Sequence, residues 1–169
     1  EQEKLLKVGF DVDVKAQKFT RDIAYATIES SNYRHNPYDK AKFEVSAHNF
    51  IDMSEDDYGL SILNDCKYGY EVNEQRMIIT LLKAPMNPDP KSDRGDHYFT
   101  YSIYPHAGNW KDAETLVRGL EINNPMLPVD IAANATGAES ASFIAVDGKN
   151  VTLEAVKKCE DEDAYIVRF

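Results

Sequence analysis

The stretch YGYEVNEQRMIITLLK, residues 68–83, decides the fold class. Its two arms, 68–72 and 76–83, carry aromatic and β-branched side chains, and a short polar segment, NEQ, lies between them. This order predicts a β-hairpin. The second arm is apolar on both faces, which is typical of a central strand covered on both sides.

Alternating patterns continue upstream of this hairpin. Residues 7–14, KVGFDVDV, place every second apolar side chain on one face, as a half-buried strand requires. The pattern predicts further strands over 19–29, around 43–47 and over 60–63. Between these strands, the polar segment 30–40 predicts a loop and the segment 53–59 predicts an acidic turn.

Downstream, the proline-rich segment 84–96 predicts a long loop, and 97–104 alternates as a strand that Pro105 ends before His106. A helix is expected over 112–120 with Asp112 as its cap. Residues 127–132 are strand-like. The Asp-Gly pair at 147–148 favours a hairpin of 143–146 with 151–156, and 164–169 is a last strand.

These elements predict an all-β fold, mainly β with one short helix. The arrangement expected is an antiparallel β-sandwich, supersandwich-like, formed by one domain over residues 1–169. Both ends of the chain fall inside strand patterns. Because an exposed strand edge must be protected, we expect a domain excised from a longer multidomain chain.

Composition excludes several classes of partner. The chain has 169 residues and a formal net charge of −10, with 28% charged and 43% hydrophobic residues, which is a globular balance. An acidic surface argues against nucleic acid and against an anionic membrane. The two cysteines, Cys66 and Cys159, form no disulfide framework, and the expected location is cytoplasmic.

One candidate metal site combines Asp93, Asp96, His97 and His106, whose side chains suit zinc or manganese. The odd spacing of the two histidines places them on opposite faces of a strand, which favours structural histidines over metal ligands. Cys66 beside Lys67 could have a lowered pKa, but a small buried role is the stronger interpretation.

Two clusters fit contact with a sugar better. The strings NDCKYGY and PHAGNW each join polar donors, an aromatic ring and a glycine. Tyr68 and Trp110 could stack on sugar C–H faces, Asp65, Lys67 and His106 could bind hydroxyls, and Gly69 lets the backbone approach closely. The alternative is a pair of tight turns that carry surface aromatics.

Longer strings resemble one family. They are FEVSAHNFIDMSEDDYGLSILNDCKYGYEV at 43–72, ITLLKAP at 79–85, DPKSDRGDHYFTYSIYPHAGNW at 89–110 and SFIAVDGKNVTLEAVKKCEDEDAYIVRF at 142–169. In this order they resemble the C-terminal β-domain of family 38 glycoside hydrolases, the retaining α-mannosidases. One departure is the string SSNYRHN at 30–36, where Tyr33 stands at the place of a family histidine.

The resemblance implies a parent enzyme that removes terminal α-linked mannose from oligosaccharides. It places the zinc ion and the nucleophilic aspartate in an N-terminal catalytic domain, so that neither catalytic residues nor a cofactor are expected in this chain. The partners implied are that N-terminal domain of the same chain and a mannose-containing oligosaccharide. Lys67 to Gly69 are expected to approach the sugar and to shape the wall of its site.

Two alternatives stay open from the sequence. One is an independent carbohydrate-binding module without catalysis, which Tyr68, Tyr104 and Trp110 would serve. The other is a small self-contained glycosidase that uses two carboxylates. The acidic residues single out no such pair, and the sequence contains no nucleophile elbow or phosphate-binding glycine motif.

Overall fold

The computed structural model describes residues 3–148 and 150–169. Backbone contacts divide the chain into two compact units, one that reaches to Leu127 and one that spans Pro128–Phe169. The one-domain assignment of residues 1–169 stays a prediction. No helix within the described ranges has both the length and the apolar composition needed to cross a membrane.

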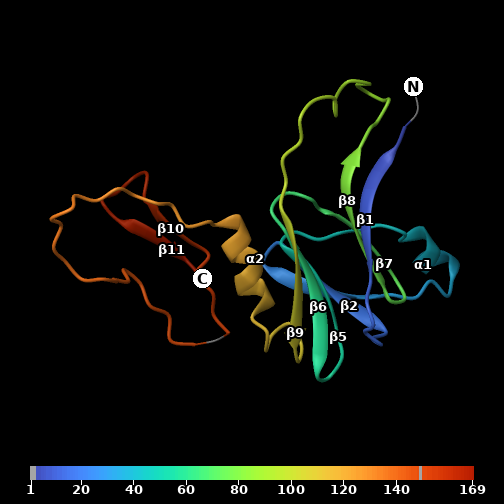
Figure 1. Cartoon of the computed structure of the whole chain (residues 1–169), viewed down its shortest axis with the longest axis horizontal. Helices are drawn as coiled ribbons and strands as arrows, with labels where there is room; N and C mark the ends of the chain where they lie inside the picture. The colour runs from blue at the N-terminus through green and yellow to red at the C-terminus, as the bar shows by residue number, and fades with distance from the viewer. Residues whose placement is uncertain (1–2, 149) are drawn as a thin grey trace. The chain divides into compact units, whose positions relative to one another are not determined.

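The first unit is built from two antiparallel sheets, which confirms the predicted all-β class (Figure 1). The four-stranded sheet has the order β1-β8-β7-β4, and the five-stranded sheet has the order β3-β2-β5-β6-β9. The strands of the first sheet are β1 (Leu5–Asp11), β4 (Val45–Ser46), β7 (Gly69–Asn73) and β8 (Arg76–Lys83). Those of the second are β2 (Lys18–Ile23), β3 (Ala26–Ser31), β5 (Phe50–Ser54), β6 (Tyr58–Asn64) and β9 (Tyr101–Ala107).

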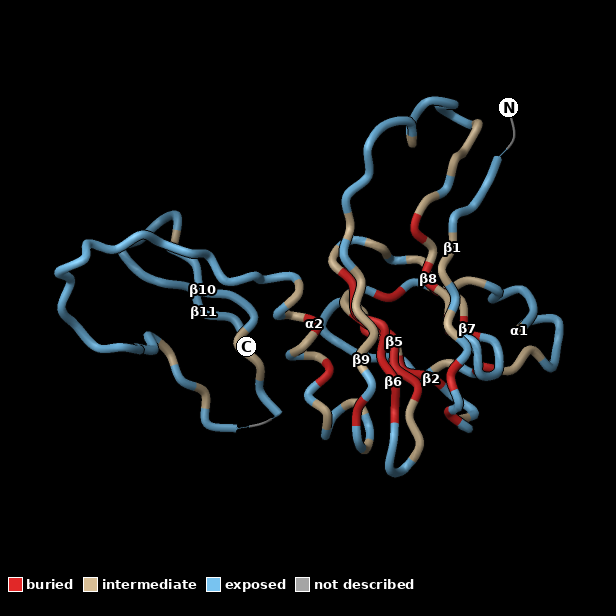
Figure 2. The backbone as a smooth tube through the Cα atoms, in the orientation of Figure 1, coloured by how far each residue is buried: buried red, intermediate tan, exposed pale blue. Residues whose placement is uncertain are grey.

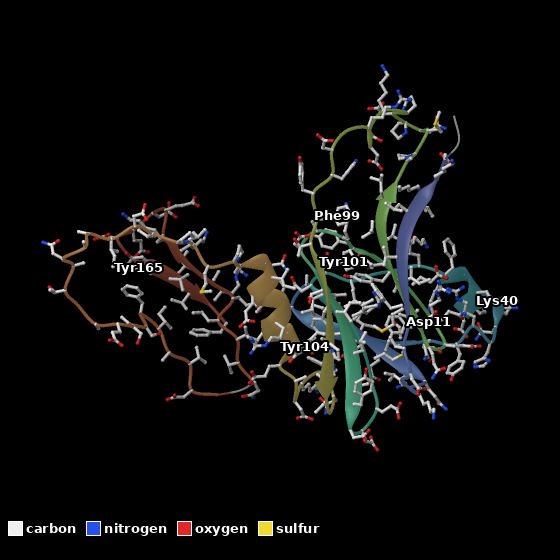
Figure 3. All side chains as sticks on the ribbon, in the orientation of Figure 1. Asp11, Lys40, Phe99, Tyr101, Tyr104 and Tyr165 are labelled. Atoms are coloured by element: carbon white, nitrogen blue, oxygen red, sulfur yellow. The ribbon has the colours of Figure 1, made fainter. Side chains whose placement is uncertain are left out.

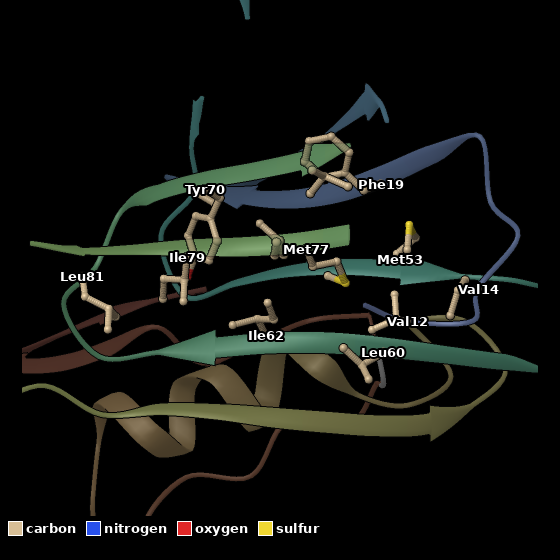
Figure 4. Close-up of a cluster of buried hydrophobic side chains, with 13 residues drawn as sticks. Val12, Val14, Phe19, Met53, Leu60, Ile62, Tyr70, Met77, Ile79 and Leu81 are labelled. Atoms are coloured by element: carbon tan, nitrogen blue, oxygen red, sulfur yellow. The ribbon is translucent and has the colours of Figure 1, made fainter. Parts of the chain in front are cut away.

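The core lies between these two sheets, where apolar side chains of both sheets meet (Figure 4). Met77, Ile79 and Leu81 of β8 meet Ile62 and Met53 of the other sheet in one cluster. Each fully buried apolar side chain of this size stabilises the fold by about 1.5–3 kcal/mol. In Figure 2 the buried part of the tube therefore follows β5 and β6.

The β7–β8 hairpin forms as predicted, with Tyr70 opposite Ile79 and Val72 opposite Met77. β8 is central, because it pairs with β1 on one side and with β7 on the other.

Helix α2 (Thr115–Asn123) packs on β5 and β6. Asp52 and Ser61 alternate along β5 and β6 with the core residues Ile51 and Ile62, so their side chains lie on the face of the five-stranded sheet that points away from the core. Helix α2 covers this face. A second helix, α1 (Pro37–Ala41), lies between β3 and β4.

Several predicted elements of the first unit differ from the structure. Residues 19–29 form no single strand, because a turn at Ala24 and Tyr25 divides them into β2 and β3, with Tyr25 at a φ of 60°. The predicted loop at 30–40 contains α1. Asn36 caps that helix by accepting a hydrogen bond from the Asp39 backbone N–H at 2.9 Å, and Pro37 takes its first position.

The predicted strand at 97–104 is displaced to Tyr101–Ala107 and continues through Pro105, contrary to the prediction that Pro105 ends it. Pro105 is tolerated because β9 is an edge strand. Helix α2 begins three residues later than predicted. Its N-cap is Glu114, in a left-handed conformation at φ 53°, so Asp112 does not cap it.

The second unit carries one antiparallel hairpin, β10 (Ala155–Lys158) with β11 (Tyr165–Arg168). The last strand is confirmed, but its partner is β10, and no strand forms over 127–132 or 143–146. Position 149 of the predicted Asp-Gly hairpin lies outside the described residues. All eight residues of β10 and β11 are exposed, as the uniform colour of this hairpin in Figure 2 shows.

Candidate functional site

The buried side chain of Asn64 fixes the shape of the loop that follows β6. Its Nδ2 donates to the His48 carbonyl at 2.6 Å and also to the Tyr70 hydroxyl, and its Oδ1 accepts from the Lys67 backbone N–H. Because Asn64 is only 1% exposed, these bonds are shielded from water and hold the loop in one conformation. We call residues 65–69 the rim loop.

Asp65 ties the rim loop to the segment before β9. Its backbone N–H donates to the Thr100 carbonyl at 3.1 Å, and its Oδ2 accepts from the Thr100 backbone N–H at 2.9 Å. Burial raises the pKa of the Asp65 carboxyl, but hydrogen bonds from the Cys66 thiol and from Thr100 outweigh it and leave the pKa lowered. The carboxylate is therefore held as a charged anchor of the loop.

The same neighbourhood shifts the pKa of Cys66. Burial, together with the adjacent Asp65 carboxylate, raises the pKa of the Cys66 thiol, although Lys67 opposes the shift. A raised pKa leaves less thiolate at neutral pH. Cys66 is exposed, so the small buried role predicted from the sequence is wrong.

Lys67 and Tyr68 are the side chains that the rim loop presents. The Lys67 ammonium lies 4.8 Å from the centre of the Phe99 ring, a residue labelled beside β9 in Figure 3. Tyr68 is 57% exposed and meets the edge of the His48 ring at 5.5 Å between centroids. Tyr68 offers an exposed stacking face, and the Lys67 ammonium can donate to a hydroxyl.

Gly69 begins β7 in a crowded place. A Cβ there would lie 3.1 Å from Glu44 Oε1 and 3.2 Å from the Thr80 Cβ. The absence of a side chain at Gly69 thus permits β7 to pack closely on β8 at the end of the rim loop.

His106 does not lie at the rim loop. It is 8% exposed, and its Nε2 lies 2.7 Å from Asp52 Oδ2 and 3.2 Å from Ser61 Oγ. Ser61 donates to the same Asp52 oxygen at 2.7 Å, and its Oγ lies 3.2 Å from Thr115 Oγ1 of α2. We call Asp52, Ser61, His106 and Thr115 the buried polar cluster.

The sequence interpretation missed three members of this cluster. Asp52 lies in the apolar string FIDMS, where its alternation with Ile51 and Met53 places it on the opposite face from the core. This alternation can be recognised in the sequence alone. The pairing of Asp52 with Ser61, and of Gly59 with His106, depends on strand register, which no local pattern gives.

Trp110 follows β9 and is half-buried. Its ring packs on the buried ring of Phe50 with 5.7 Å between centroids, and the Lys111 ammonium lies 5.4 Å from the Trp110 ring centre. Trp110 lines a cavity of about 1040 Å³, together with Asp52 and Thr20.

His106 and the rim loop lie at opposite ends of β6. His106 pairs with Gly59 near the start of the strand, whereas Asp65 follows its last residue, Asn64. Six residues of extended chain separate Gly59 from Asp65 by about 20 Å.

The candidate metal residues are not assembled. His97 Nε2 lies 3.0 Å from the Asp93 carbonyl on an exposed loop, whereas His106 is bound to Asp52. Within residues 3–148 and 150–169, no group of three or more His, Cys, Asp or Glu side chains is arranged to hold a metal ion.

The first unit is a two-sheet antiparallel β-sandwich with a fixed polar loop at one sheet end, and comparisons with known proteins identify its family. The glycosyl hydrolases family 38 C-terminal domain matches residues 1–91, more than half of the chain. The chain belongs to this family.

Two relatives agree with this assignment, and a solved structure shares the fold. Over 99% of its length the chain is 37% identical to alpha-mannosidase G of Dictyostelium discoideum, and over 95% it is 38% identical to the human alpha-mannosidase 2C1. It spans 16% and 15% of the lengths of these two relatives. A crystal structure of an alpha-mannosidase from Enterococcus faecalis V583 shares the fold, with a TM-score of 0.74 at 17% identity, over 96% of this chain and 20% of that one.

Proposed function

We propose that this chain is the C-terminal domain of a retaining α-mannosidase that hydrolyses terminal α-linked mannose from oligosaccharides. In this proposal the chain supports the active site and shapes its wall, and it supplies neither the nucleophile nor a zinc ligand. The observation that carries the proposal is the similarity to alpha-mannosidases along 95% to 99% of the chain. The expected partner is the N-terminal catalytic domain of the same chain.

Exposed apolar side chains support a neighbouring domain. In the second unit, Ile131 is 79% exposed, Phe143 is 101% exposed and Tyr165 is 77% exposed. Side chains of this size gain stability only when another surface covers them. A catalytic domain that packs against this unit would remove them from water.

The rim loop is the part of the chain best prepared to reach a substrate in the neighbouring domain. Asn64, Asp65 and Ala47 hold its backbone, since the Ala47 N–H donates to the Tyr68 carbonyl at 3.1 Å in addition to the bonds described above. Lys67 and Tyr68 are thus presented from a rigid frame. A rigid wall positions a sugar without an entropic cost of ordering the loop on binding.

The experiment uses the full-length enzyme that contains this chain, with an aryl α-mannoside as substrate. Tyr68→Ala is expected to lower kcat/KM by about tenfold or more, which corresponds to the loss of one well-placed contact of about 1.4 kcal/mol. The melting temperature should stay unchanged because Tyr68 is exposed. Tyr98→Ala is the matched control, since Tyr98 is 87% exposed and lies outside the rim loop.

Two outcomes would contradict the proposal. If Tyr68→Ala and Lys67→Ala both leave kcat/KM at the wild-type value, the rim loop does not shape the sugar site. If proton NMR shows β-mannose as the first product, the reaction does not proceed with retention.

A further inference from the structure

The cavity beside Trp110 has the features of a ligand site of its own. Its volume of about 1040 Å³ exceeds what one hexose ring needs and suits a short oligosaccharide. Thr20 and Asp52, which are neighbours across β2 and β5, line it from the sheet side. Both are at least nine-tenths buried, so this part of the wall is polar and fixed.

The Asp52 carboxylate in this wall is held by hydrogen bonds. It accepts hydrogen bonds from Ser54, Ser61 and His106, of which the last two are described above as members of the buried polar cluster. A carboxylate with this many donors cannot turn toward a ligand without breaking buried bonds. The wall therefore presents polar atoms in set positions and no mobile charge.

One side of the cavity is aromatic. The Trp110 ring is held by Phe50 on β5, and the Trp110 carbonyl accepts from the Thr115 backbone N–H at 2.9 Å at the start of α2. The tryptophan is fixed both through its ring and through its backbone. A rigid, partly exposed indole is a surface on which the C–H face of a pyranose can stack.

The entrance carries charges of both signs. Lys15, Lys18 and Lys111 lie around it with Glu29, Glu55, Asp56 and Asp57. Lys18 and Glu29 pair with each other at 2.9 Å. The excess of carboxylates disfavours an anion, and the mixed side chains offer both donors and acceptors to hydroxyl groups.

We propose that this cavity binds a neutral saccharide, with Trp110 stacked on a pyranose face and hydroxyls bound to the polar wall around Thr20. None of residues 65–69 lines this cavity, so the site is separate from the rim loop. The inference does not rest on the proposed role of the chain in an α-mannosidase, because it is drawn from the chemistry of the cavity.

The test uses the fluorescence of Trp110, which is the only tryptophan in the sequence, and so reports on this cavity directly. Titration of the 169-residue chain with α-1,2-mannobiose should change the emission saturably, with half-saturation below about 10 mM. Glycerol at matched hydroxyl concentration should give no saturable change. A flat or linear titration, or the same curve with glycerol, would overturn the proposal.

A pair of isosteric variants tests the wall. Thr20→Val removes one hydroxyl from the cavity and should raise the half-saturation concentration by about fivefold, as expected for the loss of one hydrogen bond. Thr27→Val makes the same change on β3 at an exposed position outside the cavity, and should leave the curve unchanged. Equal half-saturation for Thr20→Val and the wild type would refute the assignment of the wall.

The proposal stays testable even if a variant unfolds, because the titration of the wild-type chain alone can refute it. Failure here is also distinguishable from failure of the proposed function. That function is tested by turnover in the full-length enzyme with rim-loop variants, whereas this site is tested by binding to the chain.

Discussion

Gly59 leaves the space in which His106 reaches Asp52, and Gly59→Ala tests whether this space stabilises the fold. A Cβ at residue 59 would lie 2.3 Å from His106 Cε1 and 2.5 Å from Ser54 Oγ. Ordinary van der Waals contact begins at 3.4 Å, so the imidazole would have to move by about 1.1 Å, the difference between 3.4 and 2.3 Å. A displacement of that size away from Asp52 lengthens the 2.7 Å bond beyond hydrogen-bonding distance.

The cost has two parts. Overpacking in a dense interior costs about 1–3 kcal/mol, and a buried polar group left without its partner costs about 1–3 kcal/mol. The better strand propensity of alanine offsets about 0.5–1 kcal/mol. We expect the free energy of unfolding to fall by about 2–4 kcal/mol.

Urea unfolding followed by Trp110 fluorescence measures this change. With a slope of about 2 kcal/mol per molar, the midpoint should fall by about 1–2 M. Gly137→Ala is the matched control, because a Cβ there meets nothing within 4 Å, and it should leave the midpoint in place.

A double-mutant cycle separates crowding from other effects of alanine. In a His106→Ala background the imidazole is gone and only the close approach to Ser54 Oγ remains, so Gly59→Ala should cost less there than in the wild type. An unchanged midpoint for the single variant, or the same cost in both backgrounds, would refute the idea that Gly59 exists to admit His106.

Three further changes test other parts of the site. Asn64→Ala should lower the free energy of unfolding by about 2–3 kcal/mol, since it leaves the Lys67 N–H and other buried groups unbonded, and urea unfolding measures this loss. Asp65 has a lowered pKa, so its stabilising contribution is complete above its ordinary value of 3.8 and is lost as the pH falls below that value. The difference in unfolding free energy between wild type and Asp65→Asn should therefore disappear in that acidic range. A difference independent of pH would contradict the anchoring role. Burial raises the pKa of Asp22 above 3.8. The stability that Asp22 contributes is therefore complete below that value and is lost as the pH rises through the folded pKa. Asp22→Asn should gain stability relative to wild type as the pH rises from about 3 to about 7, which thermal unfolding can check.

Local patterns predicted the parts of the fold that depend on local order. The β7–β8 hairpin needs two apolar arms and a short polar turn, and all three lie within residues 68–83. The turn at Tyr25 was missed because neither glycine nor proline marks it. Tertiary pairing of β2 with both β3 and β5 overrides the uninterrupted strand pattern there.

In the candidate site, too, the sequence predicts what depends on local order and not what depends on long-range pairing. Residues of the rim loop are neighbours in sequence, so their proximity needs no knowledge of the fold. The distance between Lys67 and Trp110 depends on the register of β6 and β9, which pairs Asn64 with Tyr101 and Gly59 with His106. A one-residue slip would reverse every side chain of the strand, and only long-range packing excludes it.

Helix α2 links the middle of β6 to its end, and this explains why a polar sheet face is stable. Thr115 at its first turn contacts Ser61, and the Asn123 side chain at its end donates to the Asn64 carbonyl at 3.0 Å. The helix rises about 12 Å between these residues, close to the length of the strand segment that it follows. The rim loop and the buried polar cluster are therefore braced by the same helix. Because buried polar groups stabilise only when they are bonded, the position of α2 decides whether this face supports a site.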